Sequence, residues 1–165
     1  MPSERQMLIA TLKDELARTK RVIAAYPAAQ AELRPHPTSN SARELVHTFC
    51  VEAVISTAAA NGTLDASKIT GFPPAPATWG EVTAAFEGAQ AGMLQAVEAM
   101  SDADMGRTVK FLSGPKQVSP VPAGAVLWMM LHDHIHHRGQ LSVYLRMSGG
   151  KVPSIYGPSK DEPWN

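Results

Sequence analysis

The positions of the prolines constrain this chain more than any other feature of its sequence. Its 165 residues include thirteen prolines, which fall in short groups and leave long proline-free runs at 3–26, 38–72, 77–114 and 123–152. Because a proline inside a helix removes a backbone hydrogen bond and clashes with the preceding turn, helices are expected within these runs. The sequence therefore predicts four helices, near 3–26, 41–60, 78–100 and 123–147.

Apolar periodicity and capping residues support these helices. Apolar side chains recur at spacings of three and four in each run, as they do on one face of a helix. Ser39 or Ser41 can cap the second helix, and Thr78 with Glu81 matches a capping box at the start of the third. The helix starts are therefore signalled by residues that can satisfy free backbone N–H groups.

Amphipathic helices without a series of strands favour an all-α fold, a four-helix bundle, formed by residues 1–165 as a single domain. The stretch RTVKFL at 107–112 is expected to be a loop or a minor strand, and without a partner strand it predicts no sheet. The tail at 148–165 is rich in turn residues but contains Ile155, Tyr156 and Trp164. We therefore expect the tail to pack on the surface of the bundle.

Composition and charge exclude several classes of protein. Lys plus Arg equals Asp plus Glu at 15 each, so the basic surface expected of a nucleic-acid or anionic-membrane binder is missing. The longest apolar stretches are far shorter than the roughly 20 residues that span a bilayer. The N-terminal segment lacks the basic stretch and apolar core of a secretion signal. We therefore expect a cytoplasmic protein with neither a nucleic-acid nor a membrane partner.

Histidines are concentrated in the fourth predicted helix. His132, His134, His136 and His137 fall within six consecutive residues. The apolar stripe of this helix continues through Asp133 and His137, which are four residues apart and therefore share a face. The sequence predicts that this carboxylate and this imidazole point into the bundle and need a partner there.

The partner predicted from the sequence is His47, which lies in the apolar context ELVHTFCVEAV of the second helix. Bundles build metal sites from side chains that project inward from facing helices. His47, Asp133 and His137 would supply two imidazoles and one carboxylate, with open coordination positions. The alternatives are a hydrogen-bonded core histidine at position 47, a simple i,i+4 pair on the last helix and a solvated face for the other histidines.

The string HHRGQL at 136–141 resembles the DinB/YfiT-like superfamily of four-helix metal-binding proteins, together with the single histidine of the second helix and the tail KVPSIYGPSKDEPW. The resemblance runs nearly the full length of the chain. It implies that His47, Asp133 and His137 hold a divalent metal ion. The family typically has a histidine where this chain has Asp133, so His134 is a second candidate for that ligand.

The resemblance also implies a function. Members of the family include thiol-dependent S-transferases, a thiol-dependent maleylpyruvate isomerase and hydrolase-like proteins. We therefore expect a metal-dependent transferase or hydrolase that uses zinc, nickel, iron or manganese. Its expected partners are a small-molecule substrate, a low-molecular-weight thiol among the candidates, and a second copy of the chain in a homodimer.

Three residues near the expected ligands have two interpretations each. Arg138 would bind a substrate carboxylate or be paired within the fold, and Gln140 would orient a ligand or face solvent. Cys50 lies one turn after His47, within reach of a metal or redox role, but free cysteines are most often buried packing residues.

A noncatalytic metal-binding or stress-response bundle is the competing function. An open cavity beside the metal ligands would favour the enzyme, and a sealed site would favour the noncatalytic protein.

Overall fold

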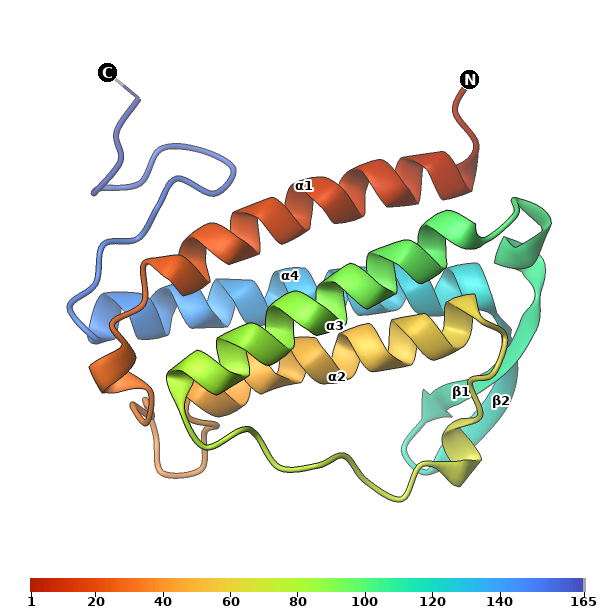
Figure 1. Ribbon diagram of the computed structural model, residues 1–165, viewed down its shortest axis with the longest axis horizontal. Coiled ribbons are helices and arrows are strands. Elements are labelled where there is room, and N and C mark those ends of the chain that lie inside the picture. The colour runs from red at the N-terminus through yellow and green to blue at the C-terminus, as the bar shows by residue number, and fades with distance from the viewer. Residues whose placement is uncertain (165) are drawn as a thin grey trace.

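The computed structural model describes residues 1–164 and confirms the predicted helical bundle (Figure 1). The long helices of this part of the chain are α1 (Glu4–Ala24), α2 (Ala42–Ala60), α3 (Trp79–Ala99) and α4 (Ala123–Met147). Short 3₁₀ turns occur at Ala28–Gln30, Ala66–Lys68 and Ala103–Gly106. The predicted helix boundaries agree with these to within a few residues.

The helices are arranged so that α1 and α2 both pack against α3 and α4. Helices α2 and α3 run in the same direction. The long connection at 61–78, which joins them in sequence, runs back along the outside of the bundle from the end of α2 to the start of α3 (Figure 1). Helices α1 and α2 lie on opposite sides of the bundle (Figure 1). Helices α2 and α4 pack directly against each other, so side chains from the two can form one site.

The predicted N-caps form as expected. Ser41 accepts a hydrogen bond from the N–H of Glu44, whose carboxylate accepts from the N–H of Ser41 at 2.8 Å. Thr78 and Glu81 make the same reciprocal pair at the start of α3. These capping boxes satisfy backbone donors that the helix itself leaves free.

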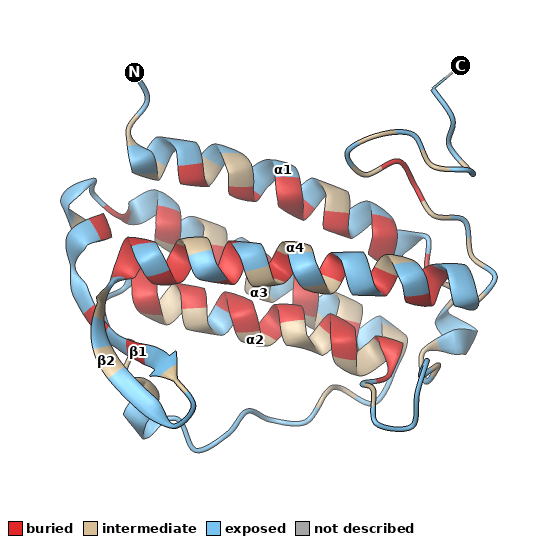
Figure 2. Cartoon of the chain, turned by 180° about the vertical axis from the view of Figure 1, so that it is seen from behind, coloured by how far each residue is buried: buried red, intermediate tan, exposed pale blue. Residues whose placement is uncertain are grey.

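The core runs along the inner faces of the helices (Figure 2). Leucines of α1, Phe49 of α2, Phe86 of α3 and Leu141 of α4 are buried. None of the helices in residues 1–164 combines the length and the apolar character needed to cross a membrane.

The expectation that residues 107–112 form no sheet is wrong. Strand β1 (Thr108–Gly114) pairs antiparallel with β2 (Gln117–Pro122), and Lys116 turns the hairpin with a φ of 59°. Strand β2 contains two prolines, Pro120 and Pro122. In a two-stranded ribbon each strand has a free edge, so a proline that lacks an N–H can be accommodated. The hairpin packs Val109 and Phe111 against the bundle.

The tail packs on the bundle, as predicted. Arg21 of α1 donates to the carbonyl of Ser154 at 3.0 Å, and Arg146 of α4 pairs with Asp161 at 2.6 Å. Ile155 packs against the buried cluster formed by the helices. The tail is therefore attached to both α1 and α4.

Acid should release part of this tail. The guanidinium of Arg146 lowers the pKa of Asp161, and the N–H of Ser154 lowers the pKa of Glu162. Carboxylates with lowered pKa values stabilise the folded state above their unfolded pKa, near pH 4, and this contribution is lost as the pH falls through the folded pKa. We expect the amide resonances of Val152 and Ser154, which donate to these carboxylates, to shift below about pH 4.

The matched control for this titration is Glu162→Gln, which should abolish the shift of the Ser154 amide and leave that of Val152. Amide resonances that stay constant from pH 6 to pH 3 in a folded protein would contradict the expectation.

Candidate metal centre

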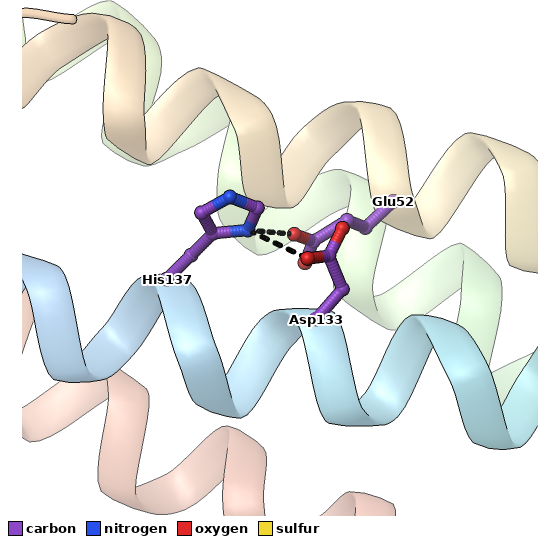
Figure 3. A group of neighbouring side chains, drawn as sticks. All are labelled: Glu52, Asp133 and His137. Atoms are coloured by element: carbon purple, nitrogen blue, oxygen red, sulfur yellow. Dashed lines mark hydrogen bonds and ion pairs between the residues drawn. The ribbon is translucent and has the colours of Figure 1, made fainter. Parts of the chain in front are cut away.

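Three potential metal ligands meet where α2 faces α4 (Figure 3). Glu52 of α2 and Asp133 and His137 of α4 each offer one ligand atom, and these atoms all lie within 4.8 Å of one another. Nδ1 of His137 is 2.6 Å from Oε1 of Glu52 and 3.7 Å from Oδ1 of Asp133. The i,i+4 spacing on α4 places Asp133 and His137 on one face, as the sequence predicted.

Glu52 raises the pKa of His137. Its carboxylate accepts a hydrogen bond from the ring, and this outweighs the desolvation that lowers the pKa. The proton on Nδ1 of His137 therefore lies between His137 and Glu52, at the place where the three potential metal-ligand atoms converge. A metal ion bound through this nitrogen would displace that proton.

The second oxygen of Glu52 lies beside His134. Oε2 of Glu52 is 3.3 Å from Nδ1 of His134, within ion-pair range, yet within residues 1–164 it lacks a hydrogen-bond partner. The hydroxyl of Thr19 donates to the carbonyl of Glu15 and lies 2.8 Å from Nε2 of His134. Since a hydroxyl has one proton, Nε2 must donate to Thr19. Thr19 thus fixes the ring of His134 from the α1 side, while Oε2 of Glu52 has no hydrogen-bond partner within residues 1–164.

This donor set fits a divalent cation. Two carboxylates match its charge, and Glu52 is a buried carboxylate with one oxygen free of hydrogen bonds in the described part of the chain. Burying a carboxylate is costly unless it is hydrogen-bonded or binds a cation. Carboxylate oxygens with one imidazole suit manganese, iron(II) and zinc.

An open cleft of about 620 Å³ adjoins these ligands. Glu52 and Asp133 form part of its lining, and Asp133 keeps 44% of its side chain exposed. The volume lies in the range of small-molecule sites, about 300 to 1,000 Å³. Asp133 is thus reachable from solvent at the edge of the group, and an open cavity beside the ligands is the feature expected of an enzyme.

The structure places His47 apart from this group. Nε2 of His47 is 2.9 Å from the carbonyl oxygen of Pro73 in the connection that follows α2. Five residues separate His47 from Glu52, which corresponds to about 140° around a helix of 3.6 residues per turn. When Glu52 points at α4, His47 therefore points toward the 61–78 connection. In this conformation only Asp133 and His137 of the three predicted ligands come together.

The inward face of α4 also differs from the prediction. His134 is buried, whereas Asp133 and His137 lie at the border of the core and His132 and His136 are exposed. The reason is that α4 packs against both α1 and α2, so its buried face is wider than a single stripe. His134 points between these two helices, and Asp133 points into the cleft.

Arg138 is paired within the fold. It is 1% exposed, lies 2.5 Å from Oε2 of Glu15 and donates to the hydroxyl of Tyr156 at 2.5 Å. It is therefore unavailable to a substrate carboxylate. Gln140 is exposed and lies 2.9 Å from the ring of His136, which fits the solvent-facing interpretation.

Cys50 is a buried packing residue. Burial raises the pKa of its thiol to about 11. Because the thiolate is the reactive form, we expect Cys50 to resist alkylation at pH 8 in the folded protein and to react readily in denaturant. Labelling with iodoacetamide followed by mass spectrometry measures this. Equal rates in the folded and denatured protein would contradict it.

Glu52 was not predicted as a ligand from the sequence, although its position carries a signal. Glu52 continues the buried stripe of α2, which consists of Leu45, Phe49, Glu52, Ser56 and Ala59. A glutamate on an otherwise apolar buried face needs a partner.

The DinB superfamily model matches residues 11–141, from α1 into α4. This chain belongs to the DinB superfamily. A 42-residue stretch is 45% identical to YrdA of Bacillus subtilis (strain 168) and covers 26% of this chain and 25% of YrdA. The similarity to this curated relative thus spans about a quarter of its length.

Solved structures share the fold of this DinB protein. A DinB-like protein of Bacillus cereus ATCC 10987 superposes with a TM-score of 0.75 at 16% identity, covering 90% of this chain and 95% of that one. YfiT of Bacillus subtilis superposes with a TM-score of 0.63 at 15% identity, covering 92% of each chain. YfiT is described as a probable metal-dependent hydrolase with an unusual four-helix bundle topology. At these identities the likeness concerns the fold.

Proposed function

We propose that this DinB protein binds one divalent metal ion through Glu52, Asp133 and His137 and uses it in an enzymatic reaction on a small molecule. The observation that carries this proposal is the convergence of three donor atoms, within 4.8 Å of one another, beside an open cleft. The description of YfiT as a probable metal-dependent hydrolase supports hydrolysis as the first reaction class to test. Transfer of a low-molecular-weight thiol, which the sequence resemblance implies, is the second.

Each residue has a distinct part in this proposal. Asp133 and His137 present their donor atoms from one rigid helix, and Glu52 completes the set from the facing helix. Thr19 holds the ring of His134 in place on the inner side of Glu52. A divalent ion with free coordination positions supplies a nucleophile at neutral pH by lowering the pKa of a water or thiol ligand.

The test is elemental analysis of protein purified without a histidine tag, beside the variants His137→Ala and His36→Ala. His36 is an exposed loop residue that contacts Thr38, so its variant controls for the loss of a histidine away from the site. We expect about one ion per chain in the wild type and the His36→Ala protein, and a loss in His137→Ala with the helical circular dichroism unchanged. Wild-type protein that holds no metal after reconstitution would refute the proposal.

Catalysis is tested separately on the metal-loaded protein. Neutral esters and amides are screened with and without a reduced thiol, and activity should disappear in His137→Ala. Stoichiometric metal with no turnover in either screen would instead favour the noncatalytic metal-binding bundle.

A further inference from the structure

The walls of the cleft beside Glu52 and Asp133 are apolar and come from three elements. Leu112 lies on β1 at the cleft with 54% of its surface exposed, and Met129 of α4 is also exposed. Large exposed apolar side chains that gather at one concave place mark binding sites on soluble proteins. The apolar wall residues are Val51 and Ile55 of α2, Phe111 and Leu112 of β1, and Met129 and Met130 of α4.

The cleft is lined by carboxylates and histidines. Glu52 and Asp133 contribute carboxylates, His132 and His136 stand on α4, and within residues 1–164 neither lysine nor arginine lines the cleft. Arg138, the arginine nearest the ligands in sequence, is buried against Glu15. A divalent ion would balance the two carboxylates, and the lining offers neither lysine nor arginine to pair with a further anionic group. An anionic group pressed against the apolar walls would lose its hydration without gaining a lysine or arginine as a partner.

We propose that this cleft takes an uncharged, largely apolar small molecule, with one donor group directed at Glu52, Asp133 and His137 and an apolar body against Leu112, Met129 and Ile55. This inference gives the substrate class of the enzyme and rests on the proposed function. The volume of about 620 Å³ suits a molecule of this kind. Substrates that carry carboxylates or phosphates away from the reacting group are disfavoured.

The first test needs no metal. N-phenyl-1-naphthylamine is uncharged and fluoresces on entering an apolar site, so it reports on the cleft with or without a chelator present. We expect Leu112→Asp to weaken its binding at least 10-fold, because the introduced carboxylate lies on the cleft wall. Val143→Asp is the matched control, since Val143 on α4 is 56% exposed and lies outside the cleft lining. Equal binding to both variants would overturn the proposal.

The second test uses metal-loaded protein and alkyl hydroxamic acids, which pair a metal-binding head with an apolar chain. Affinity measured by calorimetry should rise about 4-fold for each added methylene that is buried. A carboxylate at the far end of the chain should lower it at least 10-fold. A carboxylated compound that binds as tightly as the neutral one would contradict the proposed substrate class.

The two tests separate the two proposals. If the naphthylamine binds at Leu112 but hydroxamates do not bind, the metal site is wrong and the apolar cleft stands. If hydroxamates bind with no effect of chain length or of Leu112→Asp, the metal site stands and the apolar recognition is wrong. The inference would also be overturned if light scattering shows a dimer and the dimer does not bind the naphthylamine. The apolar walls would then form an interface between copies of the chain.

Discussion

Replacing Arg138 by methionine should destabilise the protein by about 3–5 kcal/mol, the range found when one partner of a buried ion pair is removed. Both side chains of this pair are almost fully buried, Arg138 at 1% and Glu15 at 7% exposure. Without the guanidinium, the carboxylate of Glu15 keeps the half-buried Arg18 at 3.2 Å and the hydroxyl of Tyr156 at 2.7 Å. Neither can replace a fully buried cation.

Denaturant unfolding followed by circular dichroism measures this loss. Two further variants show whether the cause is an uncompensated charge. Arg18→Met should cost about 1 kcal/mol or less, because its pair with Glu15 is partly exposed. The double variant Glu15→Gln with Arg138→Met should recover much of the loss, since both charges are then gone. A single Arg138→Met variant as stable as the wild type would show that the pair contributes nothing.

Replacing Glu52 by glutamine should lower the affinity for a divalent metal ion at least about 100-fold, more than is typical when a residue that only supports a ligand is lost. The substitution removes one of the two carboxylates in the group and keeps the size of the side chain. The glutamine oxygen can still accept a hydrogen bond from His137, so the fold should be retained. Calorimetric titration of the metal-free protein measures the affinity.

The comparison with His47→Ala separates the two ligand sets. The structure brings Glu52 to Asp133 and His137, whereas His47 contacts the carbonyl of Pro73. We therefore expect His47→Ala to bind the metal within about 3-fold of the wild type, and Glu87→Gln on α3 to serve as a control for the loss of a surface carboxylate. Metal binding lost in His47→Ala and kept in Glu52→Gln would favour the set predicted from the sequence.

The sequence by itself determined the helices and the ends of several of them. Prolines and glycines bound the helical runs, and Ser41 with Glu44 and Thr78 with Glu81 fix helix starts through local hydrogen bonds. It also determined that Asp133 and His137 share a face of α4, because that follows from a spacing of four residues. These features depend on neighbours within about one helical turn.

Tertiary structure decided which side chains meet between helices. The rotation of α2 about its axis brings Glu52 rather than His47 to α4, and the docking of α4 between α1 and α2 buries His134 and leaves Asp133 facing the cleft. The pairing of β1 with β2 likewise places Leu112 at that cleft. The contacts of Glu52 and Thr19 with α4 join residues more than 80 positions apart. Helical periodicity gives the face on which each residue lies but leaves open which helix covers that face.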